Sequence, residues 1–113
     1  MTIAERVTGP ATVLELSGRL VLGDGDEPLK GKVKDLMQQG ATHVMLNMTE
    51  VTYIDSAGLG ALVGVSLSAR CQGRVITLVN PSKRLLELLA SARLQNVVKV
   101  CESEEHALDS KGA

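Results

Sequence analysis

The chain has 113 residues, of which 44% are hydrophobic and 22% charged, and its formal net charge is −1. Domains cluster at roughly 100–150 residues, so we expect residues 1–113 to form a single domain. The high apolar content and the small net charge argue against disorder. One tyrosine and no phenylalanine or tryptophan leave no aromatic platform for single-stranded nucleic acid. With balanced charge as well, we expect no nucleic-acid partner.

Targeting and membrane signals are not evident. The first residues lack a basic region followed by an apolar one, so they do not resemble a signal peptide. No apolar run reaches the roughly 18 residues of a membrane span; the longest, 57–69, contains three glycines and two serines. We expect a cytoplasmic protein with Cys71 and Cys101 as buried thiols outside a disulfide, since nothing points to secretion.

Strand and helix patterns alternate along the chain. The strand-like segments 3–7 and 11–16 are separated by a Gly-Pro turn and predict a hairpin. A glycine-rich acidic loop follows at 23–28. The next apolar residues recur at helical spacing: Leu29, Val33, Leu36 and Met37. Pro28 suits the first turn of this helix and Gly40 its end.

The second half continues the alternation. Segments 44–46 and 51–54 are strand-like, and 57–71 predicts a helix that is largely buried, because apolar and small residues fill most of its circumference. Residues 75–79 form the clearest strand. Three elements complete the chain: a helix around the leucines of 85–89, a strand at 97–100, and a terminal helix capped by Ser103 with Glu104 and Glu105 in its first turn. We therefore expect an α/β fold, a small mixed β-sheet with an N-terminal hairpin followed by βα units and helices packed on the sheet.

Enzyme signatures are weak. The glycines of 58–64 follow a strand and open a helix, but the third is one position too late for a dinucleotide fingerprint. We interpret them as allowing close helix packing. His43 and His106 belong to no cluster with metal-ligand spacing, and we expect both at the surface. Asp55 and Ser56 are adjacent, which argues against a Ser-His-Asp triad. We expect neither catalysis nor a metal or cofactor.

The junction at Asp55 and Ser56 is the most informative position. Ser56 lies at or beside the N-cap of the predicted helix. One interpretation is that Ser56 only caps the helix, a hydrogen bond that contributes about 1 kcal/mol of stability. The other is reversible phosphorylation, because a helix N-terminus tolerates added negative charge. A phosphate adds about −1.5 to −2 charges. With Asp55 and the acidic loop nearby, it would repel a partner fitted to the neutral surface. The residues alone leave both interpretations open.

The stretch VTYIDSAGLGAL at 51–62 resembles the signature of the STAS domain, in particular that of bacterial anti-sigma factor antagonists. Four further segments resemble other parts of that family's pattern: Leu16–Leu20, Leu46–Thr49, Val79–Ser82 and Glu104–Leu108. The resemblance thus covers almost the whole chain. It implies the family fold, a small mixed sheet with helices packed against it.

The resemblance also implies a function. In antagonists a partner anti-sigma factor, itself a serine kinase that holds ATP, phosphorylates the serine matched here by Ser56. The unphosphorylated form binds that kinase and frees a sigma factor, and a serine phosphatase restores it. The resemblance and the helix predicted at 57–71 together predict a set of partner-binding residues. They are Asp24, Asn47, Asp55, Ala57, Gly58, Leu59, Gly60, Leu62 and Val63. Tyr53 is interpreted as a packing residue, and the protein as a monomer or weak dimer.

Two departures from the family pattern leave points open. The acidic loop does not show whether Asp24 or Asp26 faces the site. Arg93 stands where many members have glycine, so the turn after the third helix can differ. An alternative function is a constitutive assembly subunit of a lipid-transport ABC complex or another regulatory complex, with Ser56 only as a helix cap. A third is a nucleotide-binding sensor that uses the same helix start.

Overall fold

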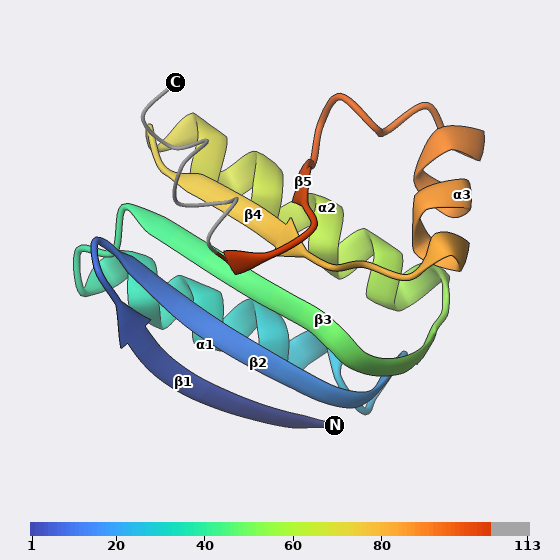
Figure 1. The fold of residues 1–113 in the computed structure, drawn as a ribbon, viewed down its shortest axis with the longest axis horizontal. Helices are drawn as coiled ribbons and strands as arrows, with labels where there is room; N and C mark the ends of the chain where they lie inside the picture. Colours follow the sequence, from blue (N-terminus) through green and yellow to red (C-terminus); the bar gives the residue numbers. More distant parts are fainter. Residues whose placement is uncertain (105–113) are drawn as a thin grey trace.

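The computed structural model describes residues 1–104, which form a five-stranded sheet and three helices (Figure 1). In chain order the elements are β1 (Thr2–Thr8), β2 (Ala11–Leu20), α1 (Asp26–Gln38), β3 (His43–Ile54), α2 (Ser56–Cys71), β4 (Val75–Val79), α3 (Lys83–Ser91) and β5 (Lys99–Cys101). The terminal helix predicted after Ser103, with Glu105 and His106, lies outside the described residues. Within them, no helix is long and apolar enough to cross a membrane.

The strands follow their sequence order across the sheet, β1-β2-β3-β4-β5. β1 and β2 form the predicted antiparallel hairpin, and β2 to β5 run parallel to one another. Leu14 pairs with Leu46, and Leu46 with Leu78, so the three central strands direct leucines to the same face. The structure confirms the expected mixed sheet, with the hairpin as its antiparallel edge.

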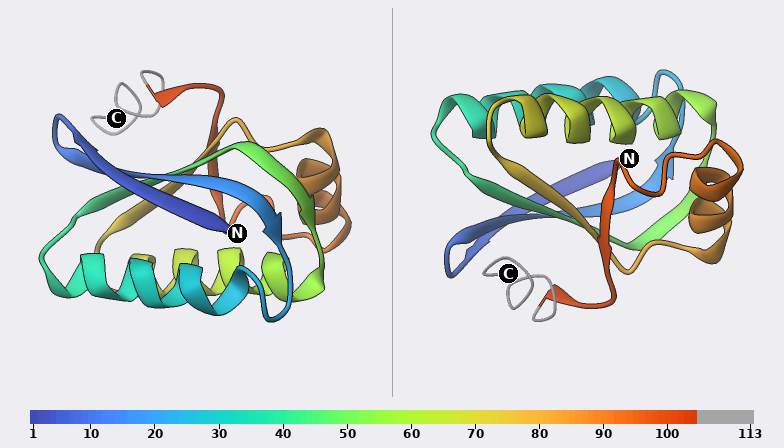
Figure 2. Two further views of the ribbon diagram at one scale, coloured as in Figure 1. Left: turned by 90° about the horizontal axis from the view of Figure 1, so that it is seen from below. Right: turned by 90° about the horizontal axis from the view of Figure 1, so that it is seen from above.

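The two long helices, α1 and α2, lie side by side on one face of the sheet, and α3 lies at one end of it (Figure 2). The main core fills the space between the long helices and the sheet. Its fully buried leucines include Leu14, Leu20, Leu29, Leu46, Leu62 and Leu78. A smaller apolar cluster lies on the opposite face: Ala11, Val13, Met45, Val79 and Cys101. Burying each leucine contributes about 1.5–3 kcal/mol, so an aliphatic core holds this fold together.

β3 is a single strand of 12 residues, not the two short segments that the sequence predicted. Polar residues in its middle interrupt the apolar pattern, Asn47 and Glu50 among them. Leu46 and Met48 face the helices, so the side chain of Asn47 between them points to the other face, which α1 and α2 leave uncovered. Because Asn47 is not packed against the helices, its polar side chain does not interrupt the strand.

The prediction that α2 is largely buried was wrong. Its buried residues form one stripe: Gly58, Ala61, Leu62, Val65, Ser66 and Ala69. Gly60, Gly64 and Leu67 are exposed, because α2 contacts the sheet and α1 on one side only and leaves the rest of its circumference to solvent. Cys71, at the end of α2, is exposed instead of buried, whereas Cys101 is buried; the two form no disulfide.

Two further burial predictions were wrong. His43 is fully buried, not at the surface, and its Nε2 lies 3.0 Å from Thr77 Oγ1 on the neighbouring strand. Because this hydroxyl offers it a polar partner, the imidazole is accommodated inside. Tyr53 is 57% exposed and so is not a packing residue. The Arg19 guanidinium lies 5.9 Å from the centre of its ring, a cation–π contact between the ends of β2 and β3.

Candidate functional site

The candidate site lies where β3 passes into α2, with Asp55 as the one residue between them. Asp55 has an extended backbone (φ −109°, ψ −174°), and its Oδ1 accepts a hydrogen bond from the Gly58 N–H at 2.9 Å. Asp55 is therefore the N-cap. Ser56, expected at or beside the N-cap, lies beside it as the first helical residue.

The Asp55 carboxylate also holds the loop that follows β2. Its Oδ2 accepts a hydrogen bond from the Leu22 N–H at 3.1 Å. The hydrogen bonds from Gly58 and Leu22 favour the charged form and hold the pKa of Asp55 below its usual value. Asp55 is thus a fixed negative charge at neutral pH that joins the loop to the start of α2.

Gly58 brings the same helix start against the end of β2. A Cβ atom on Gly58 would lie 2.0 Å from the Leu20 carbonyl oxygen, closer than any side chain permits. Gly60 and Gly64 would meet nothing within 4 Å. Close packing therefore explains the first glycine of the 58–64 pattern, while the other two lie on the open side of α2.

Ser56 is exposed at the first position of α2. Among residues 1–104, no side chain or backbone group forms a hydrogen bond with its hydroxyl, because Asp55 already provides the cap. The hydroxyl is thus accessible and adjacent to a fixed carboxylate. Nothing in the helix requires it.

The predicted partner-binding residues of α2 differ in exposure. Gly60 is exposed, and Ala57, Leu59 and Val63 are half-buried. Leu62 is 0% exposed and belongs to the main core, so the expectation that it lies on a partner surface is wrong. Gly58 is buried as well. The helical spacing that places Leu62 one turn after Gly58 turns both toward the sheet.

The acidic loop presents Asp24, not Asp26, to solvent. Asp26 is only 4% exposed and accepts a hydrogen bond from the Gly23 N–H at 2.9 Å. Asp24 is exposed and pairs with the amino group of Met1 at 2.7 Å. That amino group lowers the pKa of the Asp24 carboxyl by hydrogen bonding.

Sequence reasoning missed Leu22, which follows β2 in this loop. Its N–H binds Asp55, and its side chain is 74% exposed. The one signal for it is a leucine placed directly before a Gly-Asp-Gly segment. Because Leu22 lies in a loop, neither the strand nor the helix periodicity of the sequence predicts its position or its role.

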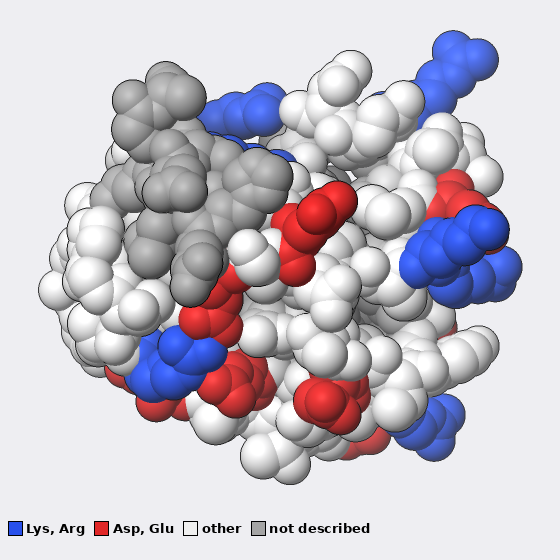
Figure 3. Space-filling view, in the orientation of Figure 1, with Lys and Arg blue, Asp and Glu red and all other residues white. Residues whose placement is uncertain are grey.

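Asn47 lies away from the site. Its Nδ2 donates to Glu104 Oε2 at 3.0 Å, and its Oδ1 accepts from the Thr49 N–H at 3.0 Å. Arg6 also donates to Glu104 and is the main cause of that residue's lowered pKa. This cluster lies on the uncovered sheet face, where acidic side chains gather toward the middle of the view in Figure 3. The structure therefore does not place Asn47 beside Ser56.

The STAS domain family model matches residues 2–107. The chain belongs to the STAS family. The anti-sigma-B factor antagonist of Bacillus subtilis is 32% identical to this STAS chain over 77 residues, which cover 68% of the chain and 70% of that relative.

Among residues 1–104, no group of three or more His, Cys, Asp or Glu side chains is placed to hold a metal ion.

Solved structures share the STAS fold. A putative anti-sigma factor antagonist from Thermotoga maritima matches with a TM-score of 0.89 at 21% identity, over 98% of this chain and 95% of that one. The Bacillus anti-sigma factor antagonist SpoIIAA matches in its unphosphorylated form with a TM-score of 0.76 at 23% identity, over 99% of both chains. Its phosphorylated form matches with a TM-score of 0.74 at 24% identity, over 97% of this chain and 99% of that one. At these identities the likeness shows the fold alone.

Proposed function

We propose that this STAS protein is an anti-sigma factor antagonist that binds an anti-sigma factor serine kinase while Ser56 is unphosphorylated, and so frees a sigma factor. The observation that carries the proposal is the exposed Ser56 hydroxyl at the start of α2, which has no hydrogen-bond partner among residues 1–104 and follows a cap supplied by Asp55. The names of the relatives support it. This role belongs in the cytoplasm.

The covalent step takes place on Ser56 with the reagents held by its partner. The Ser56 oxygen attacks the γ-phosphorus of ATP in the kinase, the bond from that phosphorus to its bridging oxygen breaks, and ADP leaves. A base of the kinase takes the hydroxyl proton. A serine phosphatase reverses the modification with water and releases inorganic phosphate. This chain acts as a substrate and a binding protein, not as the catalyst.

The charge at the site explains how one phosphate would act as a switch. It would change the formal net charge from −1 to about −3. The helix N-terminus favours this negative charge, so the fold persists. Asp55 is held by two hydrogen bonds and cannot turn away, so two adjacent negative groups face the partner. A partner fitted to the unphosphorylated surface is then repelled.

The surface around Ser56 defines the proposed docking area. It includes Asp55 and the partly or fully exposed predicted residues Asp24, Ala57, Leu59, Gly60 and Val63. To these we add Leu22 and Tyr53, which are 74% and 57% exposed. One aromatic side chain among small and aliphatic residues gives few strong anchors, so we propose a reversible complex of moderate affinity.

Calorimetric titration with the candidate kinase tests this proposal. Ser56→Ala should bind as tightly as the wild type and Ser56→Asp at least about tenfold more weakly. Ser68→Asp is the matched control, because Ser68 is exposed on the same helix, about 18 Å farther along it, and should bind normally. Equal loss of binding in both aspartate variants would contradict a role specific to Ser56.

A further inference from the structure

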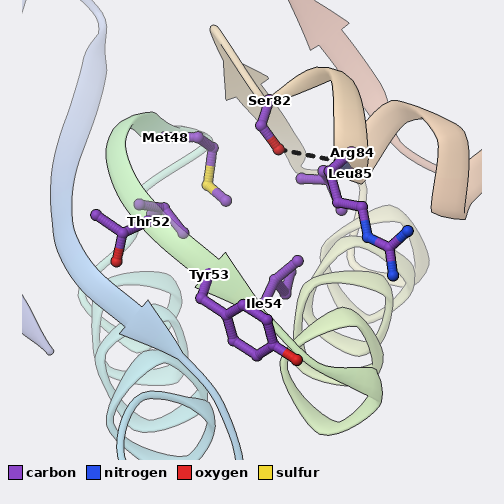
Figure 4. A pocket seen from close by; sticks show the side chains of 8 residues that line it. Met48, Thr52, Tyr53, Ile54, Ser82, Arg84 and Leu85 are labelled. Carbon is purple, nitrogen blue, oxygen red and sulfur yellow. Dashed lines mark hydrogen bonds between the residues drawn. The ribbon is translucent and has the colours of Figure 1, made fainter.

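A second surface feature lies between the carboxyl-terminal half of β3 and the start of α3. It is a pocket of about 300 Å³ (Figure 4). Its lining residues come from these two segments: Met48, Val51, Thr52, Tyr53, Ile54, Ser82, Arg84 and Leu85. This volume lies at the lower end of the range for small-molecule sites, roughly 300–1,000 Å³. Ser56 is not part of the lining.

The inner part of the pocket is apolar. Met48, Ile54 and Leu85 are 3%, 8% and 1% exposed, and Val51 is half-buried. These side chains belong to the main core or pack against it, so they form a fixed wall. An apolar group of several carbon atoms that enters here leaves water without requiring the core to rearrange.

The pocket lining contains one cation, Arg84, three hydroxyl side chains and no acidic residue. In Figure 4, Ile54 lies between the Tyr53 ring and the Arg84 guanidinium. Arg84 forms no ion pair with the described residues. The Ser82 oxygen accepts from the Leu85 N–H at 3.1 Å, which leaves its O–H to donate. The Arg84 cation, without an anion in the lining, complements a negatively charged group.

We propose that this pocket binds a small amphiphilic carboxylate. Its apolar chain lies against Met48, Ile54 and Leu85, and its carboxylate lies at the Arg84 guanidinium. A cationic ligand would meet Arg84 as a like charge, and a neutral one would leave that cation unpaired. The inference is independent of the phosphorylation of Ser56.

The test uses octanoate as the probe and 1-octanol as its uncharged counterpart. Titration of the whole chain, followed by amide chemical shifts, should give saturable octanoate binding with a Kd of about 1 mM. The shifts should concentrate at 48–54 and 82–85. Octanol should bind at least about fivefold more weakly. Diffuse shifts, no saturation, or equal binding of the two probes would overturn the proposal.

Three variants sharpen this test. Arg84→Gln should weaken octanoate binding about fivefold and leave octanol binding unchanged. Val51→Phe fills the pocket and should abolish binding of both probes, while the same spectra report whether the fold persists. Lys34→Gln removes an exposed cation on α1 and should change neither affinity. If Arg84→Gln and Lys34→Gln have the same effect on octanoate, the carboxylate is not held at Arg84 and the proposal fails.

Discussion

The backbone of Gly58 packs so closely against Leu20 that a Cβ atom would lie 2.0 Å from the Leu20 carbonyl oxygen. This contact joins the start of α2 to the end of β2. The oxygen belongs to the backbone, so it cannot move aside as a side chain would. Gly58→Ala should therefore lower the free energy of unfolding by about 3 kcal/mol, as measured by urea denaturation.

Gly60→Ala is the matched control for this prediction. Gly60 lies on the same helix, and a Cβ there would meet nothing within 4 Å. Alanine has the higher helix propensity, so this variant should gain about 0.5–1 kcal/mol. Equal effects of the two substitutions would show that helix propensity, not the Leu20 contact, determines the outcome at Gly58.

The identity of the cap gives a second prediction. Asp55 accepts the Gly58 N–H, whereas the Ser56 hydroxyl has no hydrogen-bond partner among residues 1–104. Asp55→Ala should therefore cost about 1–2 kcal/mol of stability, and Ser56→Ala should change it by less than about 0.5 kcal/mol. Thermal unfolding of the two variants measures this difference. A larger loss for Ser56→Ala would mean that serine is the cap after all.

The pH dependence of stability follows from the lowered pKa of Asp55, caused first by the Gly58 N–H and then by the Leu22 N–H. A carboxyl whose pKa is depressed by folding stabilises the native state above its unfolded pKa of about 3.9. This contribution is lost as the pH falls through that value toward the lower folded pKa. The stability advantage of the wild type over Asp55→Asn should thus be full at pH 6 and shrink below about pH 4. An advantage that stays constant across this range would refute the linkage.

Arg93 provides a stability prediction outside the site. It follows α3 with φ +58°, a left-handed conformation that costs a non-glycine residue roughly 1 kcal/mol. Arg93→Gly should stabilise the protein by about 0.5 kcal/mol, after the greater freedom of glycine in the unfolded chain is subtracted. Ala92→Gly, at φ −89°, should instead destabilise it.

Much of the fold could be predicted from the pattern of apolar residues. Segment 75–79 coincides with β4 because all five of its residues are apolar or β-branched. The length of β3 could not be predicted, since Asn47 and Glu50 interrupt the apolar pattern and only the three-dimensional sheet shows which face they occupy. His43 was misplaced for the same reason, because its partner Thr77 is 34 positions away.

The site could be located from the sequence but not resolved in detail. Asp55 and Ser56 both belong to residue types that cap helices, and only the backbone conformation shows which one does. Leu62 belongs to the core because the side of α2 on which it lies faces the sheet. The sequence does not show which side of the helix that is. Leu22 donates its N–H to Asp55, which is 33 positions away in the sequence. No local sequence pattern predicts such a contact.

Phosphopeptide mass spectrometry tests the central claim most directly. The whole chain is incubated with the candidate anti-sigma factor kinase and ATP, beside Ser56→Ala and Ser68→Ala. Our account predicts one phosphate on Ser56 in the wild type and in Ser68→Ala, and none in Ser56→Ala. Phosphate on Ser56→Ala at the wild-type level, or no phosphate on the wild type under conditions in which the kinase binds it, would contradict the account.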